Sequence, residues 1–415
     1  MYSLQLTGEQ REFRDTVRDF VASEIKPVIL HPDALQGAAG VLRTDLLART
    51  AEMGLRALML SEANGGAGGD CLTACIVAEE LAAGDVGIAV TLAETWTLAG
   101  YLFDTAMSPE QRARYLPTFS ADDAFHLAFA GLPGVADSGW RYHRPFDAPV
   151  PAPAGVAAAR QANGDWLLDG ESGFVANAPV AKLFAVQVRT PGAGDPVTLL
   201  VPRDHPGLTV REPQEGGRGS GPNGEPRVKW YHGSGGQIVL KQCRVPAADV
   251  LSNPAAGPDA AAAAGRGSPQ AAAMNIGVGR AAFEAAVDYA KLRVQGAKPI
   301  IQHQAIGTLL AKCATKLEVA RHMVRNAAWA ADHPEAYADR TLSDLPLQAV
   351  AAAFTAEAMY EVAEDAAECF GAMGVMLDMP LPKYVHETRI FLHSGRSTAV
   401  DNFRIAEAVA GFARG

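Results

Sequence analysis

The chain has 415 residues, of which 48% are hydrophobic and 20% are charged, and its formal net charge at pH 7 is −10. This apolar content can offset the entropy of ordering the chain, which excludes a globally disordered protein, and the length allows two or three folded units. A negative chain without a block of Lys and Arg is unlike a nucleic-acid-binding protein. The N-terminus turns polar at once, and we see no uninterrupted apolar stretch long enough to span a bilayer, so we expect a cytoplasmic protein.

The cysteine pattern indicates reduced, mostly buried thiols. Five cysteines, an odd number, stand at positions 71, 75, 243, 313 and 369 in apolar or mixed segments rather than in pairs. Cys71 and Cys75 would share a helix face at i and i+4, but no histidine or further cysteine nearby completes a zinc set. We therefore expect these cysteines to pack in the core and expect no bound metal.

The first part of the chain has helical periodicity. Residues 8–25 follow Thr7, a suitable N-cap, and carry apolar side chains at helical spacing with Glu and Arg on the other face. Further helical patterns, separated by turn-rich pieces, occupy residues 46–53, 71–83, 88–103 and 109–119. These patterns predict an N-terminal helical domain over residues 1–121.

The sequence pattern changes after Asp122, where short runs rich in β-forming residues are bounded by Gly, Pro, Asn and Asp. The predicted strands are 126–130, 166–168, 183–188, 197–201 and 237–240. Residues 145–153 and 212–226 are rich in proline or glycine and predict exposed loops. We expect a β-domain over residues 122–252.

Helical periodicity returns after an Ala-, Gly- and Pro-rich linker at 253–267. The predicted helices are 271–293, 304–333, 347–370 and 401–412, and their apolar faces suit a bundle that also packs across subunits. We expect a C-terminal helical bundle over residues 268–415. The fold class is therefore α+β.

Several segments resemble sequence motifs of the acyl-CoA dehydrogenase family and occur in the same order as in that family. They are LTGEQREFRDTVRDFVASEIKP at 6–27, MGLRALMLSEANGGAGGD at 53–70, AEELAAGD at 78–85, MSPEQRARYLP at 107–117, NGDWLLDG at 163–170, CRVPAADVL at 243–251, YAKLRVQGAKPIIQHQAI at 289–306 and ECFGAMGV at 368–375. Each segment is weak alone, but together they are specific. The resemblance implies the acyl-CoA dehydrogenase fold, with an N-terminal helical domain, a middle β-domain and a C-terminal four-helix bundle.

The resemblance also implies a cofactor and a reaction. FAD would lie between the β-domain and the bundle of a tetramer or a dimer of dimers, with its adenine end held by the neighbouring subunit. The family removes the α-hydrogen of an acyl-CoA as a proton while the β-hydrogen leaves as hydride to flavin N5. A carboxylate must take that proton, and burial in an apolar pocket raises its pKa toward the operating pH.

The usual base positions of the family hold no carboxylate in this chain. Counting forward from the glycine turn at 368–374 places the family's E-G-T triplet on Gly395, Arg396 and Ser397, so the base position is Gly395. A smaller branch of the family carries the base on the first bundle helix, at or near Gly267. The resemblance therefore implies a member without its usual catalytic Glu.

The flavin-contacting motifs are altered as well. The family's T-E-P-x-A-G-S-D motif is represented at best by GLPGVADS at 131–138. Its W-I-T-N strand becomes FVAN at 174–177, which keeps an aromatic side chain in Phe174 but has Ala176 in place of the hydroxyl. Arg293 stands where the family binds the FAD pyrophosphate, and an Arg fork suits paired phosphate oxygens. Gly296, Glu368 and Ala372 replace an aromatic residue, a glutamine and a glycine of the family motifs.

Shared FAD binding would then use, besides Phe174, the residues Arg293, His303, Gly371, Gly374 and Ser397. For Arg293 the alternative is a surface ion pair, which contributes little. For Gly371 and Gly374 the alternative is helix termination, and both readings can hold together.

Glu94 is the remaining acidic candidate, because it lies in TLAETWT at 91–97, on the helix that lines the acyl pocket in this family. Some alicyclic acyl-CoA dehydrogenases place a catalytic acid on this helix. Between Leu92 and Trp96, a buried Glu94 would have the raised pKa that a general base needs. The alternative is a solvated or ion-paired glutamate.

Two further features remain open between function and packing. His393 and Arg396 flank the empty base position and could contact a substrate carboxylate or phosphate, or could be structural. The loop WYHGSG at 230–235 concentrates aromatic residues and glycine before a predicted strand, where it would line a pocket, form a subunit interface or pack in the core.

Three interpretations follow. The first is an acyl-CoA dehydrogenase-like flavoprotein acting on a CoA thioester, of the kind found in the degradation of steroid and alicyclic acids, as the base-less subunit of a heteromeric FAD enzyme. The second is a self-sufficient enzyme that uses an unusual acid such as Glu94. The third is a flavin-dependent monooxygenase on the same fold. All three imply acyl-CoA or flavin chemistry without nucleic acid or membrane.

Overall fold

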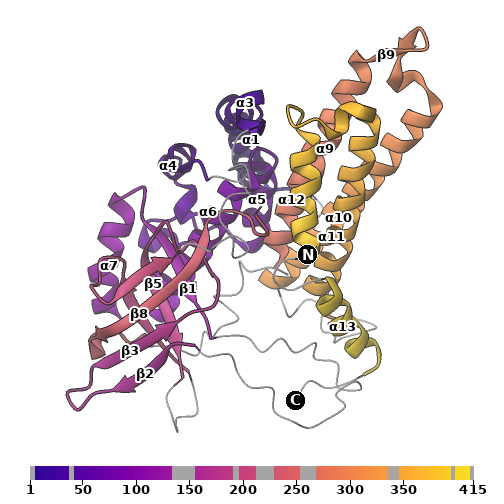
Figure 1. The fold of residues 1–415 in the computed structure, drawn as a ribbon. Helices are drawn as coiled ribbons and strands as arrows, with labels where there is room; N and C mark the ends of the chain where they lie inside the picture. Colours follow the sequence, from indigo (N-terminus) through magenta and orange to yellow (C-terminus); the bar gives the residue numbers. More distant parts are fainter. Residues whose placement is uncertain are drawn as a thin grey trace.

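The computed structural model describes residues 5–36, 42–132, 155–189, 196–211, 229–252, 268–333, 335, 345–393 and 398–411. Helices come first, strands follow, and long helices complete the chain. Figure 1 shows the strands on one side, the long helices on the other, and the N-terminal helices between them. This arrangement confirms the predicted α+β architecture.

The N-terminal helices begin with a capped helix. Thr7 Oγ1 accepts from the Gln10 amide and Gln10 Oε1 accepts from the Thr7 amide, both at 3.1 Å, which forms a capping box. The helices of this part are α1 (Gly8–Phe20), a π-helical turn (Val21–Ile25), α2 (Lys26–Ile29), α3 (Pro32–Gln36), α4 (Thr44–Glu52), α5 (Cys71–Ala82), α6 (Val86–Ala99), a second π-helical turn (Gly100–Ala106) and α7 (Pro109–Ala121). The five helices expected from periodicity are confirmed, and α2 and α3 are additional.

The apolar run Val86–Ala106 corrects one expectation. Its 21 residues are long and apolar enough to cross a bilayer by length and composition. However, 78% of its most apolar window is buried inside the fold, where α6 packs against strand β1 and helix α9. A central core helix is apolar on all sides, so length and composition alone do not distinguish it from a membrane span. Its burial is that of a core helix.

The strands form two sheets. Strand β1 (His126–Ala130) pairs parallel with β5 (Ala181–Val188), which pairs antiparallel with β6 (Val197–Pro202). The second sheet has the order β2 (Ala157–Arg160), β3 (Trp166–Glu171), β8 (Gly235–Val245) and β4 (Val175–Ala176), and β7 (Leu208–Arg211) also pairs with β8. The predicted strands are confirmed, and the short strands β2, β4 and β7 are additional.

The C-terminal helices pack around α11 (Leu347–Phe370), which contacts four other helices. These are α9 (Pro269–Leu292), α10 (Gln304–Asp332), α12 (Leu381–His393) and α13 (Thr398–Val409). Strands β9 (Val294–Gln295) and β10 (Lys298–Pro299) form a small hairpin between α9 and α10. Helix α12 was not predicted, and it proves central to the candidate site.

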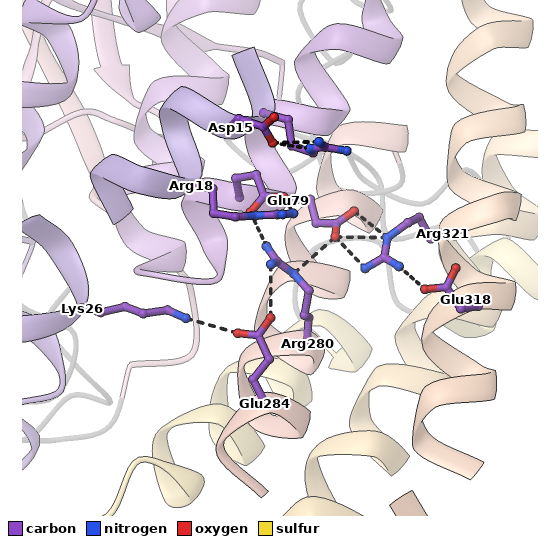
Figure 2. Close-up of polar contacts among 10 residues, drawn as sticks. Asp15, Arg18, Lys26, Glu79, Arg280, Glu284, Glu318 and Arg321 are labelled. Carbon is purple, nitrogen blue, oxygen red and sulfur yellow. Dashed lines mark hydrogen bonds and ion pairs between the residues drawn. The ribbon is translucent and has the colours of Figure 1, made fainter. Parts of the chain in front are cut away.

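A network of buried charges joins the N-terminal helices to the bundle (Figure 2). The Arg280 guanidinium lies 2.6 Å from Glu80, 3.4 Å from Glu79 and 3.3 Å from Glu284. Glu79 also accepts from Arg321 at 2.9 Å. Because the two glutamates on α5 are almost fully buried, their cationic partners on α9 and α10 fix how these helices dock.

The cysteines behave as expected in the described part of the chain. All five are free thiols, and all but Cys71 are buried. Among the described residues no group of His, Cys, Asp and Glu is arranged to hold a metal ion. The loops expected at 145–153 and 212–226 and the linker expected at 253–267 lie outside the described residues.

Candidate functional site

A cavity of about 530 Å³ lies where the N-terminal helices, the loop before β8 and α12 meet. This volume is within the usual range for small-molecule sites. Its apolar lining residues are Ile29, Leu35, Leu42, Val86, Met379 and Ile390. The cavity therefore draws its lining from all three parts of the chain.

The cavity lining also holds charged side chains, among them Arg43, Asp85, Lys229, Lys383 and Glu387. The Lys383 ammonium group forms an ion pair with the Glu387 carboxylate one helical turn later, and lies 3.9 Å from Asp85 at the start of α6. Burial would lower the pKa of Lys383, but the charges of Glu387 and Asp85 outweigh it and raise that pKa. Lys383 is therefore charged at any physiological pH.

Two histidines tie the cavity loop to α12. His232 donates from Nε2 to the Glu387 carbonyl oxygen at 3.0 Å, and His386 donates from Nε2 to the Lys229 carbonyl oxygen at 2.9 Å. Burial lowers the pKa of His386, so its imidazole is neutral at pH 7. These bonds fix the loop over the helix and shape the cavity.

The predicted flavin-facing residue Phe174 lies beside this cavity. Its ring contacts Trp230 and Tyr231 with centroid distances of 5.1 and 4.9 Å, and Tyr231 also lines the cavity. A Cβ on Gly235 would lie 2.1 Å from the Phe174 ring, so only glycine allows the ring to lie there. The loop at 230–235 therefore serves as a pocket lining, one of the roles considered for it.

Asn177, the last residue of FVAN, anchors α6 to the strands. It is fully buried with a φ of +62°, and its Nδ2 donates to the Thr91 carbonyl oxygen at 2.8 Å and to Thr95 Oγ1 at 3.3 Å. The Thr95 hydroxyl donates to the Thr91 carbonyl, so the nearby His126 Nδ1, 3.0 Å away, donates to Thr95 Oγ1. Sequence reasoning missed this network, because its members are distant along the chain.

Glu94 lies one turn along α6 from this network and does not line the cavity. Its side chain is half-buried on the helix face of Gly87 and Val90. Leu92 and Trp96, which are fully buried, lie two residues to either side and therefore face the opposite way. The apolar surroundings expected for Glu94 thus belong to another face of α6.

Arg293 and His303 stand at the small hairpin beyond α9. Arg293 is exposed, and among the described residues no ion pair with it is found, so the cofactor reading and the ion-pair reading both stay predictions. His303 donates from Nε2 to the Gln295 carbonyl oxygen at 2.9 Å, so it holds the hairpin closed. Gly296 and Ala297, with φ of +63° and +64°, form its turn.

Gly371 and Gly374 end α11 close to Arg293. Gly371 has a φ of +56°, and a Cβ on Gly374 would lie 2.4 Å from the Ala367 carbonyl oxygen. Phe370 stacks on Tyr289 of α9 with centroids 4.1 Å apart, which brings the glycine turn to the Arg293 end of the bundle. Both glycines therefore lie where α11 ends. A contact of this turn with a cofactor stays a prediction.

The two halves of the expected flavin site lie far apart within one chain. Figure 1 shows the β9 hairpin at the far end of the long helices and the β-domain on the opposite side of the molecule. Phe174 directly precedes β4, whereas Arg293 directly precedes β9. The structure thus brings Arg293, His303, Gly371 and Gly374 together but separates them from Phe174.

Several predicted positions lie outside the described residues. These are Gly395, Arg396, Ser397, Gly267 and the segment 133–138. His393, the last residue of α12, is exposed. The cavity residues Lys383 and Glu387 were not predicted, although their i, i+4 spacing in LPKYVHE would have placed them on one helix face once α12 was recognised.

Comparisons with known proteins agree with this architecture. Residues 7–123 match the acyl-CoA dehydrogenase N-terminal domain and residues 260–409 match its C-terminal domain. A probable acyl-CoA dehydrogenase, YngJ of Bacillus subtilis, is 28% identical over 400 residues and covers 94% of both chains. The mitochondrial isobutyryl-CoA dehydrogenase of Dictyostelium discoideum is 26% identical, over 94% of this chain and 86% of its own.

The solved butyryl-CoA dehydrogenase of Megasphaera elsdenii superposes with a TM-score of 0.78 at 22% identity, covering 99% of this chain and 100% of its own. The two matching domains and their order agree with the helices, strands and bundle described above. This family is a family of FAD-dependent oxidoreductases. The chain belongs to the acyl-CoA dehydrogenase family.

Proposed function

We propose that this chain is the base-less subunit of a heteromeric, FAD-dependent acyl-CoA dehydrogenase. The observations that carry the proposal are two. The β9 hairpin, which follows Arg293, lies at the far end of the long helices, away from β8, with which the strand after Phe174 pairs, and position 395 is glycine. A single FAD that used both Phe174 and Arg293 would need two chains. A second chain would also supply the carboxylate that position 395 lacks.

The described residues fit an FAD bound between two chains better than an FAD bound within one chain. Phe174 offers an aromatic face that is 37% exposed, while Ala176 offers no hydroxyl to the flavin ring. Arg293 offers an exposed guanidinium, flanked by Leu292 at 80% and Val294 at 58% exposure. Exposed apolar side chains around an exposed cation suit burial against a neighbouring subunit. When bound, FAD would accept the hydride of the family reaction.

The three-part cavity is the proposed place of the acyl group. Its apolar lining residues exclude water from the hydrocarbon, and its volume accommodates an alicyclic or steroid-derived ring system. Ile390 of α12 lines the cavity, and position 395 follows this helix in the sequence. A cytosolic location agrees with the free thiols.

A second candidate function is a self-sufficient dehydrogenase. The observation that favours it is a pair of carboxylates near the expected reaction site, Glu94 on α6 and Glu387 in the cavity. Burial raises the pKa of Glu387, as a general base requires, but Lys383 occupies one of its oxygens. Because Glu387 is engaged and Glu94 lies outside the cavity, the subunit proposal is the stronger one.

The flavin content of the purified protein tests the proposal. We expect the chain purified alone to be colourless, and the chain purified with the product of a neighbouring dehydrogenase-like gene to retain FAD. Only the mixed complex should bleach with an acyl-CoA. A lone chain that retains stoichiometric FAD and bleaches would contradict the proposal. NADH-linked oxygen consumption with a reductase would instead indicate a monooxygenase.

A further inference from the structure

Three aromatic side chains form a cluster beside the cavity, and two of them are exposed. The ring centroids of Phe174 and Trp230 lie 5.1 Å apart, and those of Trp230 and Tyr231 lie 5.2 Å apart. Tyr231 is buried, whereas Trp230 is 50% exposed and Phe174 is 37% exposed. Neither Phe174 nor Trp230 lines the cavity, so their exposed surface lies outside it.

Trp230 differs from a tryptophan of the core. Trp96 is fully buried, and its indole N–H donates to Gln270 Oε1 at 2.9 Å. Trp230 is half-exposed, and no acceptor for its indole N–H is found in the part of the chain that the structure describes. Packing in the core explains Trp96, but it does not explain a large aromatic side chain of which half remains exposed beside a second exposed ring.

The backbone on both sides of Trp230 is held in place. The Lys229 carbonyl oxygen, just before it, accepts from His386 Nε2 of α12 at 2.9 Å. After it, Gly233 has a φ of +69°, and a Cβ at this position would lie 3.1 Å from the Gly87 carbonyl oxygen of α6. Trp230 lies between these two anchors, so a ligand that packs on its ring loses little binding free energy to ordering of the loop.

The relative orientation of the two exposed rings selects the shape of the ligand. The ring planes of Phe174 and Trp230 are 54° apart, so one flat ligand cannot lie parallel to both. Aromatic rings prefer offset stacking or an edge-to-face contact. A planar ligand that stacks on one of these rings therefore meets the other ring at its edge. Trp230 is the larger and the more exposed of the two, which favours stacking on its face.

The isoalloxazine ring of FAD, the cofactor of this family, has the required shape. It is planar and electron-poor, whereas indole is electron-rich, and this difference favours stacking. Ala176, two residues after Phe174, has no hydroxyl for the flavin, which leaves ring contacts as the means of holding it there. We infer that Trp230 stacks on the isoalloxazine ring, with Phe174 at the edge of that ring. The inference rests on the proposed function insofar as this chain contributes the ring end of a shared FAD.

Riboflavin tests this contact without a partner subunit, because it carries the isoalloxazine ring but neither the pyrophosphate nor the adenine of FAD. Its fluorescence is followed while the chain alone is added up to millimolar concentration. The midpoint gives the dissociation constant, and the end point shows how strongly the bound ring is quenched by reversible electron transfer from a stacked indole. Binding too weak to survive purification is still detected, so this agrees with a colourless lone chain.

Variants separate Trp230 from the rest of the chain. Trp230→Leu should bind riboflavin about threefold to tenfold more weakly, as for loss of an aromatic pair, and should leave the bound flavin brighter. Trp230→Phe keeps a ring and should restore most of the affinity but not the quenching, which a merely structural role would not produce. Trp329→Leu is the control, because Trp329 is also partly exposed and stacks on His333 of the same chain, with centroids 4.3 Å apart. It should behave like the parent.

The inference is overturned by any of three results. These are a Trp230→Leu variant that binds and quenches riboflavin like the parent, no saturable binding of riboflavin by the parent, or tighter binding of adenosine than of riboflavin, which would assign the ring pair to adenine. Because the test involves no partner and no reaction, a chain that proves to be a dehydrogenase by itself can still pass it. An unchanged Trp230→Leu variant likewise leaves the subunit proposal standing.

Discussion

Tyr289 of α9 stacks on Phe370 of α11, with ring centroids 4.1 Å apart and ring planes 13° apart. Tyr289 begins the segment that contains Arg293, and Phe370 immediately precedes Gly371. The stack therefore joins two sequence motifs that lie far apart in the chain. It places an exposed guanidinium and a glycine turn at the same end of the bundle.

We predict that Arg293→Met weakens flavin retention by the assembled complex. Loss of a charge-assisted fork to a pyrophosphate costs about 1.5–3 kcal/mol, or roughly tenfold to a hundredfold in FAD affinity. The measurement is the dissociation constant of FAD, determined by fluorescence titration of the apo-complex. Lys291→Met, at the same helix end, is the control and should bind FAD like the parent. Unchanged retention in the Arg293 variant would refute the pyrophosphate assignment.

The glycine turn provides a second prediction, on stability. Gly374→Ala places a methyl group 2.4 Å from the Ala367 carbonyl oxygen and should lower the free energy of unfolding by about 1–3 kcal/mol. Gly371→Ala meets no atom within 4 Å, so only the backbone opposes the change; a φ of +56° with a ψ of −133° is adopted almost only by glycine and costs about 1–3 kcal/mol. Urea unfolding measures the loss in each variant. A Gly374 variant as stable as the parent would contradict the close approach to the Ala367 carbonyl oxygen.

A third prediction concerns the charge network of Figure 2. Arg280→Met leaves Glu79 and Glu80 with fewer partners in a buried setting and should cost about 3 kcal/mol of unfolding free energy. Arg211→Met is the control, because its ion pair with Glu171 is about half exposed on both sides and should contribute less than about 1 kcal/mol. Equal losses in chemical denaturation would contradict the network's role.

The fourth prediction is a pH dependence of stability that originates at His126. Burial lowers the pKa of His126 from 6.5 to about 4. Between these values the unfolded chain binds a proton that the folded chain does not, so the free energy of unfolding falls as the pH drops from 6.5 toward 4. The full effect is about 3 kcal/mol.

His126→Gln should flatten that pH dependence, measured by urea unfolding at several pH values between 4 and 7. His31→Gln, which alters an exposed histidine, should keep the slope of the parent. If the free energy of unfolding of both variants depends on pH as it does in the parent, His126 is not the group whose protonation destabilises the fold.

The fold could be predicted because its long helices are periodic and capped. Thr7 with Gln10 forms the expected capping box, and helix Leu347–Phe370 was predicted to the residue. Helix α12 was missed because its sequence LPKYVHETRIFLH mixes polar and apolar residues without a clear stripe. Tertiary packing on α11 and α9 stabilises it instead.

The candidate site was only partly predictable, because its chemistry comes from contacts between distant segments. Arg293 and the glycine turn were found through family motifs, and the structure places them together. Lys383 and Asp85 line one cavity although they are far apart in the sequence. No local sequence pattern predicts that two such distant residues lie close together. Glu94 was chosen from its sequence neighbours, which point to the opposite side of the helix.

The central claim is that this chain alone does not perform α,β-dehydrogenation. General-base catalysis contributes about a hundred- to ten-thousandfold, and Gly395 offers no group to take the α-proton. The direct measurement is the anaerobic loss of flavin absorbance after the chain alone, supplied with free FAD, is mixed with alicyclic and straight-chain acyl-CoA thioesters.

We predict no bleaching by the lone chain and rapid bleaching once the partner subunit is added. Rapid bleaching by the lone chain, abolished by Glu94→Gln or Glu387→Gln without release of FAD, would contradict the account and place the base on α6 or α12.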